Sequence, residues 1–328
     1  MVQRIYKQQD LKLALFFNGQ RGLKVLKSLR RKLNIKYVFL AKKNLDKKII
    51  KEISENFTIV NTLKNPIILE KIKKEKINLI ISAGFPYIFG EEFFIKKNKI
   101  DILNLHGGPL PRYKGGSPLV WQKIEGKKKI GISVIKANRY IDAGKILGVK
   151  FFLIRDKDNI KDIHNKSEKL FCNLLWNVIK KYYLKKDIKI NNKKTLPEKY
   201  YFQRKAVDSL ITSETMELKK INNFHKALVP LYEEPFLYYG ENKVSLEKIK
   251  TTNRKTNNRI GFVEKINNKY FLNLKDKKLR LIKTSYNLIE IKNKFLSSKI
   301  FDKDIWLEKI FNKNCYIVYN ERYIKYFK

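Results

Sequence analysis

Short apolar runs alternate with polar, helix-like stretches along the first half of the chain. The first run, residues 11–17, ends at Asn18 and Gly19, and leucines then recur at helical spacing. Further runs occupy residues 37–41, 57–60, 77–83 and 102–105. Short buried strands that alternate with helices predict an α/β fold, in which a parallel sheet is covered by helices on both faces.

The same pattern continues to about residue 183. Residues 131–135 form another apolar run, and residues 145–154 continue the sheet or form its edge. Residues 161–183 then carry apolar side chains at helix-like intervals. We expect this long amphipathic helix to close the first domain.

The pattern changes in the last third of the chain. Residues 188–204 are polar and predict a linker or an extended connection. Beyond it, residues 216–228 predict one helix, and strand-like segments follow at 243–246, 260–263, 270–274 and 279–282. We therefore expect two domains, residues 1–204 and a smaller, β-rich and barrel-like domain at 205–328. Residues 290–328 are too irregular to assign.

Composition supports a folded chain but does not by itself identify a partner. The chain has 328 residues, enough for about two domains, and its 43% hydrophobic content argues against disorder. Its 73 Lys and Arg against 31 Asp and Glu give a net charge of +42, which invites a nucleic-acid interpretation. The excess is spread along the whole chain without a basic arm, so a general bias toward lysine is the simpler alternative.

Several classes of protein are disfavoured by what the sequence contains. The longest mostly apolar stretch, residues 77–90, is shorter than the roughly 20 residues of a membrane helix and contains Gly84 and Pro86. The first ten residues are charged and do not resemble a signal peptide. Cys172 and Cys315 lie far apart, with no metal-binding or disulfide spacing. We expect a cytoplasmic protein without a membrane span or a metal.

Candidate chemistry is concentrated in residues 101–147. The turn after the first strand, NGQRG, lacks the glycine spacing of a dinucleotide site, and nothing matches a P-loop. Asn104 and His106 end a buried strand, where ligands bind in open α/β sheets. They are two residues apart, so both side chains point to the same side. Asp142 follows the strand at 131–135, which we expect beside theirs, so the three polar groups converge.

The order and spacing of three segments resemble the formyltransferase family that uses 10-formyltetrahydrofolate. These segments are AGF at 83–85, NLHGGPLPRYKGGSP at 104–118 and IDAGKIL at 141–147. The resemblance is strong over residues 75–150 and extends over 11–185 as a pattern of elements. It implies a Rossmann-like catalytic domain in residues 1–204, to which two-domain members of the family append a small β-rich domain. It also implies that Asn104, His106 and Asp142 are catalytic.

The family's reaction makes physical sense with these residues. A primary amine attacks the formyl carbon, and negative charge builds on the formyl oxygen. Asn104 would supply one hydrogen-bond donor to this oxyanion and His106 a second. Asp142 would keep His106 charged and move protons from the attacking ammonium toward the leaving nitrogen.

The resemblance also implies where the folate binds. Its pterin would occupy an apolar slot lined by Phe85, Pro86, Tyr87, Ile88, Phe89 and Ile102, and it would contact backbone groups of Arg139, Tyr140 and Ile141. A purely structural role in the core is an open alternative for Phe89 and Ile102. His164 and His225 have no partner at chemical spacing in the sequence, and we expect them to be packing or surface residues.

The acceptor amine is argued from what surrounds the motif. The glycinamide ribonucleotide branch usually has one domain, and the formyltetrahydrofolate hydrolases carry a leading domain that we do not expect here. Methionyl-tRNA formyltransferases resemble this chain in length and basic charge, but they carry a long basic insertion after the second strand. Residues 37–54 contain nothing comparable, and His225 replaces an arginine of their C-terminal motif.

The sugar N-formyltransferases share the two-domain build without that insertion. We therefore expect formyl transfer to the amine of a nucleotide-linked amino sugar, for a surface polysaccharide such as lipopolysaccharide, with initiator Met-tRNA as the alternative acceptor. Arg21, Gly107 and Gly108 are the candidate substrate-binding residues, and Arg21 suits a diphosphate. A homodimer is possible, as in relatives. A binding protein that keeps the fold only as a scaffold is a further alternative, against which the intact Asn104, His106 and Asp142 argue.

Overall fold

A seven-stranded sheet is the centre of the computed structural model, which describes residues 7–297 except 44, 96–99, 187–188, 191–196, 213–215 and 258. The strand order is β3-β2-β1-β4-β5-β7-β8. The strands are β1 (Lys12–Phe17), β2 (Asn34–Ala41), β3 (Phe57–Val60), β4 (Leu79–Ala83), β5 (Asp101–His106), β7 (Lys129–Lys136) and β8 (Lys145–Leu153). Parts of the expected linker, and residues 298–328 of the unassigned segment, lie outside the described residues.

The direction of the strands divides the sheet into two parts. The first five strands run parallel to their neighbours, which confirms the predicted parallel sheet. β7 pairs with β5 in the antiparallel sense, and β8 pairs with β7 in the same way as the edge strand. The apolar run of a buried strand has no intrinsic direction, so the sequence pattern indicates β7 and β8 without showing that they are antiparallel.

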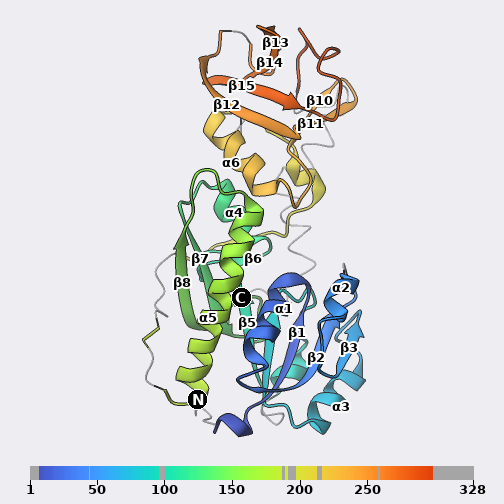
Figure 1. Ribbon diagram of the computed structural model, residues 1–328, viewed down its shortest axis with the longest axis vertical. Helices are drawn as coiled ribbons and strands as arrows, with labels where there is room; N and C mark the ends of the chain where they lie inside the picture. Colours follow the sequence, from blue (N-terminus) through green and yellow to red (C-terminus); the bar gives the residue numbers. More distant parts are fainter. Residues whose placement is uncertain are drawn as a thin grey trace.

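Helices cover both faces of this sheet. Successive residues of β1 alternate between the faces: Leu15 belongs to the core under α1 (Gly19–Leu29) and α5 (Ile160–Tyr183), and Phe16 to the core under α3 (Pro66–Lys74). α5 runs along the sheet as the longest described helix (Figure 1), as expected for residues 161–183. The shorter helices of this part are α2 (Lys47–Ile50), η1 (Gln8–Asp10) and η2 (Glu91–Phe94).

The last third of the chain is β-rich, as predicted, and follows a single helix. α6 (Leu218–Leu228) packs against α4 (Pro118–Ile124), and the later strands gather beyond these two helices in Figure 1. They form two antiparallel sheets. The strands are β10 (Phe236–Tyr239) and β11 (Asn242–Ser245), then β12 (Lys248–Lys255), β13 (Val263–Ile266), β14 (Lys269–Asn273) and β15 (Lys277–Lys283). The domain boundary between residues 204 and 205 stays a prediction.

Three of these strands differ from the sequence pattern, among them β10, for which no strand was predicted. The expected strand at 260–263 begins only at Val263, because residues 259–262 form a turn. β12 was not expected because its sequence, KIKTTNRK, is polar on both faces, and most of its residues are exposed. Its place is set by backbone pairing with β15. The strand therefore lacks the alternation of apolar and polar residues by which a sequence indicates a half-buried strand.

The polar connection between the two parts contains a strand that folds back. β9 (Tyr200–Tyr201) pairs in parallel with β6 (Lys114–Gly115), and a short helix, η4 (Ala206–Ser209), follows it. Gly115 has φ of +91°, and a Cβ added there would lie 2.1 Å from the carbonyl oxygen of Tyr201. Only glycine permits this close approach of two backbones. In the described part of the chain, no helix has both the length and the apolar character needed to cross a bilayer.

Candidate active site

A cleft of about 770 Å³ opens where β4 and β5 end. Its walls come from the segment after β4, the end of β5, residues 115–118, residues 135–142 and the returning strip at 200–205. Each wall follows a strand of the central sheet or of the β6–β9 pair. The cleft therefore lies where the sequence predicts ligand binding.

Asp142 is the centre of a polar cluster on the wall of this cleft. Its Oδ1 accepts a hydrogen bond from Nδ2 of Asn104 at 3.2 Å, and its Oδ2 accepts one from the backbone N–H of Gly115 at 2.9 Å. The same Oδ2 lies 3.3 Å from Nδ1 of His106. The three side chains predicted to converge do so, because β5 and β7 are neighbours in the sheet.

His106 is held from both sides. While Nδ1 faces Asp142, Nε2 lies in close hydrogen-bonding contact with the backbone carbonyl oxygen of Tyr113. Both partners can only accept, so a proton on each ring nitrogen satisfies both contacts. The His106 side chain is only 6% exposed and that of Asp142 8%. The pair is therefore largely shielded from water, with both ring nitrogens of His106 facing an acceptor.

The backbone of Asp142 is in the left-handed region, with φ of +47°. Aspartate tolerates this conformation better than most residues. Two residues later, a Cβ added at Gly144 would lie 2.0 Å from the carbonyl oxygen of Lys136, at the end of β7. Gly144 thus lets the loop pass close to β7 and aims the Asp142 carboxylate back into the cleft.

Two buried polar side chains fix the loop that follows His106. Gln122 of α4 donates to the carbonyl of Gly107 at 2.9 Å, and Ser133 of β7 donates to that of Gly108 at 2.8 Å. Gly107 lines the cleft, whereas Gly108 lies behind it beside Tyr113. The sequence interpretation did not single out Gln122 or Ser133. A polar residue within a run of apolar ones is the signal that was available for them.

The predicted folate slot forms the opposite wall. Phe85, Pro86, Tyr87, Ile88 and Phe89 all line the cleft after β4, with Ile102 of β5. The Phe85 ring meets those of Phe16 and Tyr87 edge to face, with centroids 5.3 Å apart in each pair. Phe89 and Ile102 also belong to the core under α3, and their contact with a folate stays a prediction.

Cations dominate the charge of the cleft. Arg21, Lys43, Arg139, Arg204 and Lys205 line it, and Asp142 is the acidic residue among its described lining. Arg139 is accompanied in the cleft wall by Tyr140 and Ile141, as expected.

Two of these arginines are packed against aromatic rings. Arg21 lies over the Phe171 ring, 4.9 Å from its centroid, and Arg204 over that of Phe224 at 5.2 Å. Burial lowers the pKa of Arg21, and it lowers that of Arg204 to about 10. Nε of Arg21 and Nη1 of Arg204 are buried without a hydrogen-bond partner among the described residues. These donors suit an anionic ligand.

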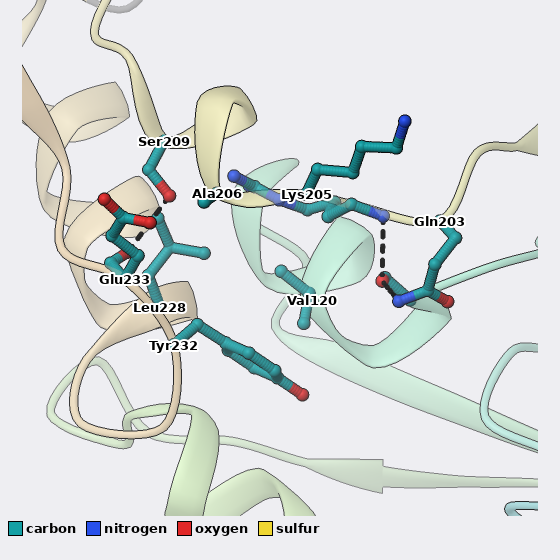
Figure 2. Close-up of a pocket in the computed structure, with 10 residues that line it drawn as sticks. Val120, Gln203, Lys205, Ala206, Ser209, Leu228, Tyr232 and Glu233 are labelled. Atoms are coloured by element: carbon teal, nitrogen blue, oxygen red, sulfur yellow. Dashed lines mark hydrogen bonds between the residues drawn. The ribbon is translucent and has the colours of Figure 1, made fainter. Parts of the chain in front are cut away.

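The strip at 200–205 is the part of the site that sequence reasoning missed. Tyr200, Tyr201, Phe202, Gln203, Arg204 and Lys205 all line the cleft, although the polar composition of the region predicts a linker. The aromatic cluster in this polar segment was the available signal. A second pocket of about 300 Å³ adjoins the strip (Figure 2), where Ser209, Tyr232 and Glu233 face Val120 and Gln203.

The remaining histidines lie outside the cleft lining, as expected. Nε2 of His164 is 3.3 Å from the hydroxyl of Tyr232, and burial together with the nearby Arg21 lowers the pKa of His164 to about 4. Nε2 of His225 is 3.2 Å from the carbonyl oxygen of Glu247. Within the described ranges, His, Cys, Asp and Glu side chains form no group of three that could bind a metal.

Comparisons with known proteins place this geometry in a family. A sequence model of the formyl transferase family matches residues 7–179. A methionyl-tRNA formyltransferase from Caldanaerobacter subterraneus subsp. tengcongensis is 23% identical over 66% of this chain and 69% of its own length. The bifunctional polymyxin resistance protein ArnA of Wigglesworthia glossinidia brevipalpis is 29% identical over 69% of this chain, which spans only 34% of that protein.

A solved structure extends the similarity to the whole fold. The N-formyltransferase of Helicobacter canadensis, in complex with folinic acid and dTDP-3-aminofucose, superposes with a TM-score of 0.60 at 18% identity. The match covers 84% of this chain and 99% of that one. The family model covers more than half of the chain and includes the whole polar cluster around Asp142. The chain belongs to the formyl transferase family, and its catalytic domain is that of an N-formyltransferase.

Proposed function

We propose that the protein transfers a formyl group from 10-formyltetrahydrofolate to the primary amine of a nucleotide-linked amino sugar. The observation that carries the proposal is the convergence of Asn104, His106 and Asp142 on the wall of the 770 Å³ cleft. A carboxylate beside a cation and an amide donor suits acyl transfer to an amine.

The cleft fits the co-substrate. A pterin is a flat, largely apolar ring system, and Phe85 and Tyr87 offer aromatic surface beside it. Folates also carry carboxylates, which the excess of cations along the cleft attracts. When bound, the co-substrate supplies the formyl group. The site residues of the chain would bind it, orient it and handle the protons.

Each member of the cluster has a distinct task in the proposed reaction. The amine nitrogen forms a bond to the formyl carbon, and the bond from that carbon to the folate nitrogen breaks. Asn104 donates to the carbonyl oxygen as negative charge develops on it, and the charge on His106 favours the same oxygen. The attacking nitrogen gives up two protons as it changes from ammonium to amide: Asp142 takes one and passes it to the leaving nitrogen, and the other goes to solvent.

The nucleotide-sugar acceptor is supported by the charge and shape of the cleft. A diphosphate is an anion that guanidinium groups recognise well, and Arg21 and Arg204 present buried donors from two different elements. The second pocket, which adjoins Arg204, lengthens the site in the way that an extended substrate needs. A role in surface polysaccharide synthesis follows as part of this proposal.

Met-tRNA is the second candidate acceptor. It is favoured by the similarity to methionyl-tRNA formyltransferases and by the net charge of +42. The connection between β2 and α2 speaks against it, because only residues 42–46 separate Ala41 from Lys47. The resemblance implies a long basic insertion at this position in that branch, and there is no room for one here.

Product analysis with parallel acceptors tests the proposal. Purified protein and 10-formyltetrahydrofolate are mixed with a panel of nucleotide-linked amino sugars, or with charged initiator Met-tRNA, and formylated product is measured by mass spectrometry. The matching sugar with a hydroxyl in place of the amine is the control. Turnover on an amino sugar supports the proposal, and turnover on tRNA alone supports the alternative. Inactivity on every acceptor would leave the scaffold interpretation.

A further inference from the structure

The carboxylate of Glu125 lies at the centre of a cluster behind the cleft. Glu125 directly follows α4, and its side chain is 23% exposed. Tyr113 donates its hydroxyl proton to Oε2 at 2.6 Å, and Tyr201 donates to Oε1 at 2.5 Å. Nη2 of Arg112 lies 3.9 Å from Oε2, on the same carboxylate. One side chain thus joins two tyrosines that are far apart in the sequence.

The chemistry of this cluster fixes the direction of its hydrogen bonds. Burial raises the pKa of Tyr201 to about 12 and moves that of Tyr113 further in the same direction, so both hydroxyls keep their protons. Burial also acts to raise the pKa of Glu125, but the two hydroxyls and Arg112 outweigh it and lower that pKa below its usual value. An ionised acceptor between two neutral donors gives charge-assisted hydrogen bonds, which are stronger than neutral ones.

The two tyrosine rings are packed as one unit. They stack with centroids 4.9 Å apart and an angle of 15° between their planes. Tyr113 is only 2% exposed and Tyr201 only 7%. A residue from the segment after β5 is therefore bound to a residue from the connection that returns at 200–201.

The backbones of the same two tyrosines reach the active site. The carbonyl of Tyr113 is the partner of His106 Nε2, and Tyr201 pairs through β9 with Gly115. The N–H of Gly115 in turn donates to Oδ2 of Asp142 at 2.9 Å. Each half of the His106–Asp142 pair is thus held by a backbone group whose position depends on one of the tyrosines.

We propose that Glu125 is a positioning residue of the active site, which holds Tyr113 and Tyr201 together and thereby sets the geometry of the His106–Asp142 pair. The proposal rests on the function proposed above, since it assumes that this pair carries out formyl transfer. Glu125 itself does not line the described cleft, so it acts through its neighbours.

Loss of Glu125 has a defined consequence. Without the carboxylate, two buried hydroxyls lose their acceptor, and the Tyr113 carbonyl is no longer fixed against His106. The His106 ring then loses one of the two contacts that orient it toward Asp142. The folate slot after β4 contains neither tyrosine, so the KM for the folate changes little while kcat falls. A structural role alone would change neither the ring ¹⁵N chemical shifts of His106, which report its hydrogen bonds, nor this split between kcat and KM.

The test compares Glu125→Ala with Glu125→Gln, Tyr113→Phe and Tyr201→Phe in the full chain. Glu52→Gln is the matched control, because Glu52 pairs with Lys27 on the surface, away from the cleft. For each variant, kcat, both KM values and the pH profile of kcat are measured. The ring ¹⁵N chemical shifts of His106 are measured by NMR, and the chain has only 3 histidines to distinguish.

The expected results differ among the variants. Glu125→Ala lowers kcat by about 10- to 100-fold with KM for the folate within about threefold, because small misplacements of a catalytic group are costly. It also changes the ring ¹⁵N shifts of His106. The values for Glu125→Gln lie between those of Glu125→Ala and of the wild type, since the amide still accepts one hydrogen bond. Each Tyr→Phe variant loses one hydroxyl and changes kcat and the ring ¹⁵N shifts in the same direction as Glu125→Ala.

Unchanged ring ¹⁵N shifts of His106 in Glu125→Ala and in both Tyr→Phe variants would overturn the proposal, even if kcat fell. If Glu125→Ala does not fold, the two Tyr→Phe variants, which keep the ring stack, decide the question. If the wild type formylates no acceptor, the proposed function fails. The ring ¹⁵N shifts of His106 still show whether Glu125 sets the geometry of the pair.

Discussion

Asp142 satisfies three partners with one carboxylate: the Asn104 amide, the His106 imidazole and the Gly115 backbone amide. These contacts hold the Asp142 carboxylate in place, although only 8% of its side chain is exposed. A carboxylate with this many partners is already oriented for the reaction. It therefore needs little reorganisation when it accepts a proton from the substrate. The mechanism therefore depends on atoms from β5, from β6 and from the loop that follows β7.

Removal of either charged member tests the cluster. We expect His106→Ala and Asp142→Ala each to lower kcat for formyl transfer by at least roughly 100-fold, since a group that favours the oxyanion, or the proton acceptor, is lost. Circular dichroism and thermal unfolding should show an intact fold. Rates near those of the wild type in both variants would contradict the mechanism.

Much of this cluster was predictable, because its signals are local. Asn104 and His106 are two residues apart on one strand, and Asp142 follows the next strand in the sheet. The contacts that complete the cluster are not local. Tyr113 and Gly115 contribute backbone atoms, which every residue has, so the sequence gives no sign of these contacts. The role of Tyr201 depends on the pairing of β9 with β6.

At the scale of elements, the pairing of β6 with β9 connects the catalytic domain to the returning strip. Gly115→Ala tests it, because a Cβ would lie 2.1 Å from the Tyr201 carbonyl oxygen and push the strands apart. We expect at least about a tenfold fall in kcat, as the Gly115 N–H leaves Asp142. Gly240→Ala is the control, since Gly240 also has positive φ but has open space around it. Equal activity in both variants would contradict this role.

The stability of α5 should depend on pH through His164. The folded protein keeps His164 neutral down to a pKa of about 4, whereas the unfolded chain takes up a proton near 6.5. The unfolded state therefore binds more protons between these values, and stability falls as the pH is lowered through that range. At about pH 5 the loss is at most about 2 kcal/mol.

Thermal unfolding from about pH 7 to pH 5 measures this effect. The melting temperature of His164→Gln should fall less than that of the wild type, because the variant lacks the proton uptake. His225 has a pKa lowered in the same direction and contributes to the fall in both proteins. A pH dependence that is the same in both would show that His164 titrates normally in the folded state.

At the scale of the whole molecule, the net charge of +42 is spread along the chain, but acidic side chains are scarce in the cleft. The cleft has five cationic side chains and one carboxylate in its described lining, and that carboxylate is held by His106. An anionic substrate is attracted to such a cleft, and dissolved salt screens the attraction. The local balance matters more for binding than the overall excess of lysine.

Salt dependence of KM tests this view. Between about 50 and 300 mM salt, we expect the KM of a nucleotide-linked acceptor to rise about three- to tenfold with little change in kcat. Arg204→Gln should raise KM at low salt and weaken its salt dependence. A tRNA acceptor would show a much steeper dependence, because many phosphates would be contacted. A KM that is insensitive to salt would contradict electrostatic binding in the cleft.

The overall architecture was predictable in its first half because buried strands and amphipathic helices alternate there. Features decided by long-range pairing were not: the antiparallel direction of β7 and β8, the exposed strand β12, and the return of residues 200–205 to the cleft. Local residue patterns indicate burial, whereas these features depend on which backbones meet. The parts of the site that the sequence did not predict depend on such long-range backbone pairing.

The central claim is that the Asn104–His106–Asp142 cluster formylates an amine of a nucleotide-linked sugar with 10-formyltetrahydrofolate. The most direct test measures tetrahydrofolate release and formylated product on the amino-sugar panel, with the wild type and Asp142→Asn side by side. The variant keeps the size of the side chain but loses the base. Stoichiometric product with the wild type, and at least about a hundredfold less with the variant, is the predicted result. Equal rates in the two proteins, or product with neither, would contradict the claim.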